Sequence, residues 1–64
     1  MTPRELRRIL EQNGFVFTRQ SGSHAIFKHP VSKRRVVLPI HARDIPTGTL
    51  HAILKDAGLQ SPKG

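Results

Sequence analysis

The feature that most constrains the fold is a series of three short β-rich segments separated by two tight turns. Residues 15–19, 24–29 and 34–38 are rich in the aromatic and β-branched side chains that favour strands. The clusters at residues 20–23 and 32–33 are polar and contain Ser and Gly, which favour turns. Turns this short can join only antiparallel neighbours, so the sequence predicts a three-stranded antiparallel meander.

An amphipathic helix is predicted before the strands, over residues 3–13. Thr2 is suited to the N-cap, Pro3 to the first helical position, and Glu5 completes a capping box. Gly14 follows as the residue that can adopt the left-handed conformation beyond a helix end. The apolar stripe of this helix consists of Leu6, Ile9 and Leu10.

A second helix is predicted after Pro46 and Thr47. Gly58 is suited to its C-terminal cap, and Leu59 to the apolar contact that accompanies such a cap. The apolar stripe, at spacings of three and four, is formed by Leu50, Ile53, Leu54 and Ala57.

The predicted fold class is therefore α+β, in the order helix, three strands, helix. Each helix has a single apolar stripe, so we expect both helices to cover the same face of the sheet and to leave the other face open. With 64 residues, of which 36% are hydrophobic, the chain has material for one thin core. We expect one domain over residues 1–59 and a flexible tail over residues 60–64.

The charge balance points to a polyanionic partner. Eleven Lys and Arg residues against four Asp and Glu residues give a net charge of +7, and phosphate contacts are the usual use of such an excess. An acidic protein partner fits the same charge. The chain has no Cys, which excludes disulfides and Cys-containing zinc sites. No apolar run has the length of a membrane span, so we expect a cytoplasmic protein with no membrane partner.

Few residues in the sequence are candidates for catalysis or metal binding. The four carboxylates form no obvious pair, which argues against glycosidase-type and two-metal sites. The four histidines match no zinc motif, so we predict no metal site and no cofactor. His24 follows Gly22 and Ser23 at the mouth of a hairpin, where a side chain is held on a strand end yet open to solvent. Imidazole can gain or lose a proton near neutral pH. Spacing alone favours an ordinary surface or turn-capping histidine.

The side of the sheet that His24 occupies depends on the alternation of its strand. If Phe27 faces the core, then His24, Ile26 and Lys28 face the other way. The opposite alternation, with Ile26 inward, is equally compatible with the sequence.

The chain resembles the HicA family of toxins along residues 3–59. No single piece of the resemblance is specific, but the pieces occur together and in the family's order. They are Gly14-Phe15, Arg19 to His24, Phe27, His29-Pro30, Val37, Pro39, His41, Gly48 to Leu50, Ile53-Leu54 and Ala57 to Leu59.

This resemblance implies a fold like that of double-stranded-RNA-binding domains, which agrees with the predicted order of elements. It also implies an endoribonuclease that cleaves mRNA as the toxin of a toxin–antitoxin pair, with His24 as its catalytic histidine. The implied protein partner is a HicB-type antitoxin that covers the active site. We expect a monomer when the toxin is free and a hetero-oligomer with the antitoxin.

A metal-independent mechanism follows as a hypothesis, because RNA carries its own nucleophile in the 2′-hydroxyl. His24 would act as general base toward this hydroxyl or as general acid toward the leaving 5′-oxygen, and the sequence leaves both roles open. The candidates for binding the RNA phosphates are the side chains of Arg19, Lys28, Arg34 and Arg35 and the backbone N–H groups of Gly22 and Ser23. A solvated surface charge is an equal alternative for each basic residue.

Three other functions compete with this one. The first is an RNA-binding module of the same fold that does not cut. The second is a protein-interaction domain whose charge serves an acidic partner. The third is a small DNA-binding protein, although three strands separate the helices and leave no clear helix-turn-helix.

Overall fold

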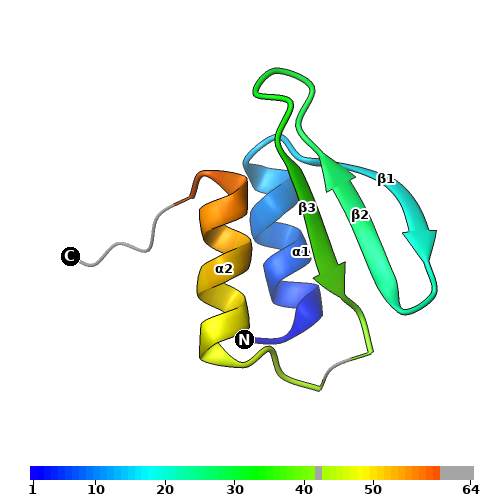
Figure 1. Cartoon of the computed structure of the whole chain (residues 1–64), viewed down its shortest axis with the longest axis vertical. Helices are drawn as coiled ribbons and strands as arrows, with labels where there is room; N and C mark the ends of the chain where they lie inside the picture. Colours follow the sequence, from blue (N-terminus) through cyan, green and yellow to red (C-terminus); the bar gives the residue numbers. More distant parts are fainter. Residues whose placement is uncertain (42, 60–64) are drawn as a thin grey trace.

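The structure, a computed structural model, describes residues 1–41 and 43–59 and confirms the predicted α+β order (Figure 1). The predicted tail, residues 60–64, lies outside the described residues. The five elements are α1 (Pro3–Gln12), β1 (Val16–Ser21), β2 (His24–Lys28), β3 (Arg35–Pro39) and α2 (Thr47–Ala57).

Helix α1 begins with the predicted capping box. The Glu5 N–H donates to Thr2 Oγ1 at 3.1 Å, and the Thr2 N–H donates to Glu5 Oε1 at 2.9 Å. The helix ends in a Schellman motif, in which Gly14 N–H donates to the Glu11 carbonyl and Phe15 N–H to the Leu10 carbonyl. Gly14 has the left-handed φ of 91° that this motif requires. Phe15 therefore belongs to the helix cap, and the first strand starts one residue later than predicted.

The three strands form one antiparallel sheet in the order β1-β2-β3. The second strand ends one residue earlier than predicted, because the backbone at His29 already turns. Its N–H donates to the Arg34 carbonyl and its carbonyl accepts from the Lys33 N–H. The third strand consequently begins at Arg35 and extends to Pro39.

Helix α2 follows Pro46, which provides no side-chain hydrogen bond to its N-terminus. Its C-terminus repeats the Schellman motif of α1. Gly58 has a φ of 76° and donates to the Lys55 carbonyl, while Leu59 N–H donates to the Leu54 carbonyl. Leu59 packs against the core, as the sequence predicts for the residue after a glycine cap.

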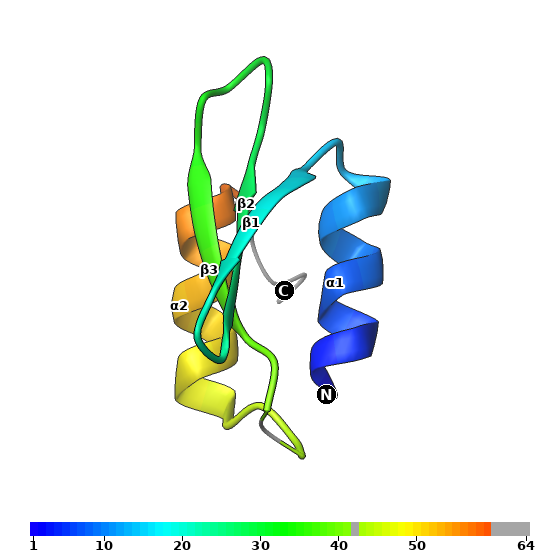
Figure 2. The same ribbon diagram turned by 90° about the vertical axis from the view of Figure 1, so that its right-hand side faces the viewer.

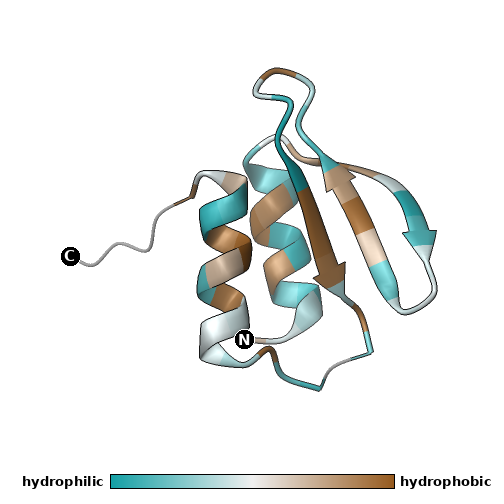
Figure 3. Ribbon diagram, viewed as in Figure 1, coloured by the Kyte–Doolittle hydropathy of each residue, from teal (hydrophilic) through white to brown (hydrophobic). Residues whose placement is uncertain are grey.

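Both helices pack on one face of the sheet. Helix α1 lies behind β3 in Figure 1 and stands apart from the strands in Figure 2. Buried side chains of α1 and of the strands belong to one core cluster. Hydrophobic residues concentrate on β2, β3 and the facing helix surfaces, whereas β1 becomes hydrophilic toward its hairpin end (Figure 3). The core cluster consists of Leu6, Leu10, Phe15, Ala25, Phe27, Val36, Leu38, Ile45, Ile53 and Ala57.

Candidate functional site

The alternation of β2 settles which side of the sheet His24 occupies. Ala25 and Phe27 are buried in the core against the helices. Because neighbouring side chains in a strand point to opposite faces, His24, Ile26 and Lys28 lie on the face without helices. This is the first of the two alternations that the sequence allows.

We call this helix-free face of the sheet the open face. The strand pairing places nine residues on it, in three rows that cross β1, β2 and β3. The rows are Ser21, His24 and Pro39, then Arg19, Ile26 and Val37, and finally Val16, Lys28 and Arg35.

The backbone of His24 is held from both sides while its side chain is exposed. As the first residue of the central strand, it pairs with Ser21 of β1 and with Pro39 of β3. Gly22 starts the two-residue hairpin loop with a φ of 59°, a conformation that L side chains rarely adopt. The Ser23 carbonyl accepts from the Ile40 N–H at 2.9 Å, which ties the loop to the end of β3. His24 is thus a solvent-accessible imidazole on a fixed backbone.

Three of the basic residues proposed from the sequence share the open face with His24. Arg19 lies diagonally across from it, at a separation of about 7–8 Å for such strand positions. Lys28 and Arg35 pair directly with each other at the opposite end of the face. All three side chains are exposed. None of the nine residues on the face is acidic, so its positive charge is not balanced locally.

Arg34, the fourth basic candidate, lies away from this face. Its Nη1 donates to the Asp56 carbonyl at 3.3 Å, at the C-terminal end of α2. An arginine in this place stabilises the last carbonyls of a helix. The structure therefore separates Arg34 from Arg35, although they are adjacent in the sequence.

The open face also has an apolar middle that the sequence argument did not single out. Ile26 is only 6% exposed although no helix covers it, and it is not part of the core cluster. The side chains around it on the same face must shield it, as the aliphatic stems of Arg and Lys can do. Val37 and Val16 remain 38% and 55% exposed beside it. The strip is identified by the register, which pairs Ile26 with Val37, together with the two-residue alternation of side chains in a strand.

His29 has a structural role. Its Nδ1 accepts hydrogen bonds from the N–H groups of Val31 and Ser32, at 3.0 and 3.1 Å. Its Nε2 lies 3.0 Å from the Asn13 carbonyl, so this arrangement places the ring proton on Nε2. The ring also contacts Phe15 edge-on, with 5.1 Å between ring centroids. His29 therefore joins the β2–β3 turn to the end of α1.

The remaining features of the described residues offer no comparable site. His41 and His51 are exposed, and residues 1–41 and 43–59 contain no group of three side chains suited to a metal ion. None of the helices in these ranges is long and apolar enough to cross a membrane.

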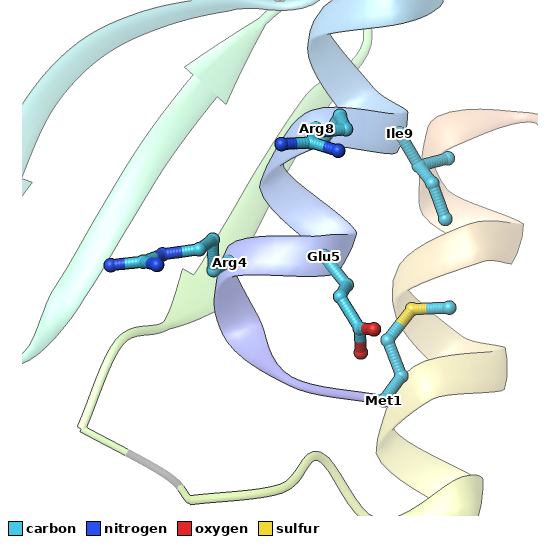
Figure 4. A pocket seen from close by; sticks show the side chains of 5 residues that line it. All are labelled: Met1, Arg4, Glu5, Arg8 and Ile9. Atoms are coloured by element: carbon cyan, nitrogen blue, oxygen red, sulfur yellow. The ribbon is translucent and has the colours of Figure 1, made fainter.

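A shallow groove of about 520 Å³ lies on the first turns of α1 (Figure 4), and His24 is not among the residues that line it. It is bordered by Met1, Arg4, Glu5, Arg8 and Ile9. Glu5 is already engaged with Thr2 in the capping box. The groove therefore combines a helix cap with two exposed arginines, and its one carboxylate is already hydrogen-bonded within that cap.

Comparison with known proteins identifies one family. The family model described as the HicA toxin of bacterial toxin–antitoxin systems matches residues 3–59, which include the whole open face. No curated protein matches the chain.

Proposed function

The chain belongs to the HicA toxin family of bacterial toxin–antitoxin systems, and on this premise we propose that it is an endoribonuclease that cleaves mRNA with His24. One observation carries the proposal. The open face presents a single exposed histidine on a fixed backbone, beside cations and with no carboxylate. This set can move a proton and neutralise phosphate charge, which is sufficient when the substrate supplies the nucleophile.

In the proposed reaction the 2′-oxygen of the RNA forms a bond to the adjacent phosphorus, and the bond from phosphorus to the 5′-oxygen breaks. The products are a 2′,3′-cyclic phosphate and a free 5′-hydroxyl. His24 accepts the proton of the 2′-hydroxyl or donates a proton to the leaving 5′-oxygen, and water exchanges the other proton. No step in this scheme is assigned to a metal ion, and DNA lacks the required nucleophile.

Arg19 is the cation closest to His24 along the sheet and is assigned to the phosphate that reacts. Its diagonal position is within reach of a long side chain. The N–H groups of Gly22 and Ser23 flank the same end of the face and are further candidates for this phosphate. The Gly22 carbonyl is already engaged, because it accepts from Gln20 Nε2 at 3.1 Å.

A HicB-type antitoxin is the proposed protein partner. The uncompensated positive charge of the open face complements an acidic surface, and a protein bound there would cover His24. RNA and antitoxin would then compete for the same face. Adding the antitoxin should release bound RNA in proportion to the complex formed, which fluorescence anisotropy of a labelled RNA measures. Simultaneous binding of both would contradict a shared surface.

The cleavage proposal is tested with the wild-type chain and the His24→Ala variant on a long single-stranded RNA in EDTA. General acid–base catalysis contributes about 10²–10⁴-fold to a rate, so the variant should lose activity by this factor. His51→Ala, an exposed histidine on α2, is the matched control and should cleave normally. Circular dichroism verifies that each variant folds, and a 2′-deoxy substrate should resist cleavage.

Other outcomes select the alternative functions. If neither protein cleaves but both bind RNA in a salt-dependent way, the chain is an RNA-binding module. Cleavage of the 2′-deoxy substrate would refute the use of the 2′-hydroxyl. Full activity in the His24→Ala variant would refute the role of this histidine.

A further inference from the structure

Two cations face each other at the end of the open face that is remote from His24. Lys28 and Arg35 are direct cross-strand partners, and both are exposed. Like charges at directly opposed positions of a sheet are destabilising. The ion pairs within residues 1–41 and 43–59 are Met1–Asp44 and Arg7–Glu11, so no carboxylate relieves this repulsion.

We propose that Lys28 and Arg35 form a separate phosphate-binding subsite, which holds the RNA backbone at a distance from the bond that is cut. The inference rests on the proposed function, because it assigns the pair to the same substrate. Two donors on neighbouring strands can contact one phosphate from both sides, and the bound phosphate would remove their mutual repulsion.

The position of the pair makes it a binding element. Lys28 is four residues from His24 along β2, which corresponds to about 13 Å in a strand. A side chain at that distance does not reach the reacting phosphate together with His24. It can reach a phosphate further along the chain, on one flank of the cleavage point only, because β2 runs in a single direction away from His24.

The surface between the two ends is suited to a nucleotide chain. The middle row holds Arg19 on one edge and the exposed Val37 on the other, around the nearly covered Ile26. Apolar side chains can contact sugars or bases here while cations at both ends hold phosphates. The subsite therefore predicts that cleavage depends on substrate length, and on one side only.

The experiment uses the full chain and a set of RNA oligonucleotides built around a cleavage site mapped on a long RNA. The oligonucleotides are extended one nucleotide at a time, either 5′ or 3′ of that site. In the wild type, kcat/KM should rise roughly tenfold at one length and on one flank, as expected for a contact between a cation and a phosphate. In the Lys28→Ala/Arg35→Ala double variant this rise should disappear, so that kcat/KM falls more on the long substrates than on the shortest one.

Arg8→Ala and Lys55→Ala are the matched controls, because both residues are exposed cations on the helices. Their double variant has the same net charge as the test variant and should keep the length dependence. Equal losses on short and long substrates would overturn the inference and place the pair in the chemistry. An unchanged length dependence would overturn it as well.

A binding measurement separates this inference from the proposed function. The His24→Ala background and an RNA of fixed length are used, and the affinity is measured against salt concentration. Each phosphate contact contributes about 0.7 to the slope of log K against log salt for single strands. Removing the pair should lower the slope, and removing the two control cations should not. An equal slope for the variant without the pair and the variant without the control cations would refute the subsite. This outcome can be read even if the wild type does not cleave RNA.

Discussion

Reversing one charge of the Lys28–Arg35 pair should make the protein more stable and its RNA binding weaker. Arg35→Glu replaces a repulsive cross-strand pair with an attractive one at the same register. Opposite charges at such positions contribute about 0.2–1 kcal/mol, and like charges cost a similar amount. The expected gain in the free energy of unfolding is therefore about 0.5–1 kcal/mol. In a domain of this size, that gain raises Tm by roughly 2–8 °C.

RNA binding should change in the opposite direction, because the new carboxylate both removes a phosphate contact and engages Lys28. Loss of the one phosphate that both side chains hold would lower the salt slope of binding by about 0.7. Thermal unfolding followed by circular dichroism gives the stability, and fluorescence anisotropy at several salt concentrations gives the affinity. The gain in Tm should shrink in 1 M salt, where the screening length falls to about 3 Å.

A double-mutant cycle makes this test specific to the pair. Lys28→Glu alone should stabilise the protein as Arg35→Glu does, and the two together should restore a like-charge pair and cancel the gain. If the single variants do not raise Tm, the two side chains do not repel each other and the physical basis of the subsite fails. If they raise Tm but leave RNA binding unchanged, the pair is not a binding element.

Three further predictions concern the fold around the site. Gly14→Ala should lower Tm by roughly 5–10 °C, because φ is 91° and the added Cβ would lie 2.6 Å from His29 Nε2. The control Gly48→Ala lies in a helix with open space around it and should raise Tm instead. His29→Ala should unfold at a lower temperature than His29→Asn, whose side-chain oxygen can still accept from the turn amides, and both folded variants should cleave RNA. Normal stability of the alanine variant, or loss of cleavage in both, would contradict a structural role. The hydrogen bond from the Thr2 N–H is the main cause that lowers the pKa of Glu5. The ionised Glu5 side chain should therefore stabilise the fold near neutral pH, and this stabilisation should fade as pH falls toward the lowered pKa. Glu5→Gln should therefore lose less stability than the wild type between pH 7 and pH 3 in urea titrations, and equal losses would refute this.

Much of the fold could be predicted from local signals in the sequence. The capping box at Thr2 and the glycines after both helices determine helix ends through short-range hydrogen bonds, and all of them occur as predicted. The errors are also local. Phe15 is an aromatic residue of the kind that favours strands, but its N–H donates to the Leu10 carbonyl and caps the C-terminus of α1. Strand propensity cannot reveal that competing hydrogen bond.

The site was less predictable, because it depends on which face each side chain occupies. His24 could be singled out from its place after a Gly-Ser turn. The face of the sheet on which it lies could be assigned only once Phe27 was known to be buried in the core. Arg34 and Arg35 are indistinguishable by composition. They differ because β3 begins at Arg35. Arg34, just before the strand, contacts α2, whereas Arg35 lies on the open face.

Arg19 shows why alternation alone would have misplaced a residue of the site. Counting by twos from Phe17, whose ring contacts Phe27 on the helix side, would put Arg19 on that side too. The pairing shifts between these residues: Phe17 lies opposite Phe27, and Arg19 lies opposite Ile26. This β-bulge inserts Thr18, whose hydroxyl donates to the Ile26 carbonyl at 2.7 Å. One extra residue thus turns Arg19 to the open face and brings Ser21 beside His24. A bulge is a common means of redirecting a side chain toward a site. The positive charge near the candidate catalytic histidine therefore depends on a single irregularity in β1.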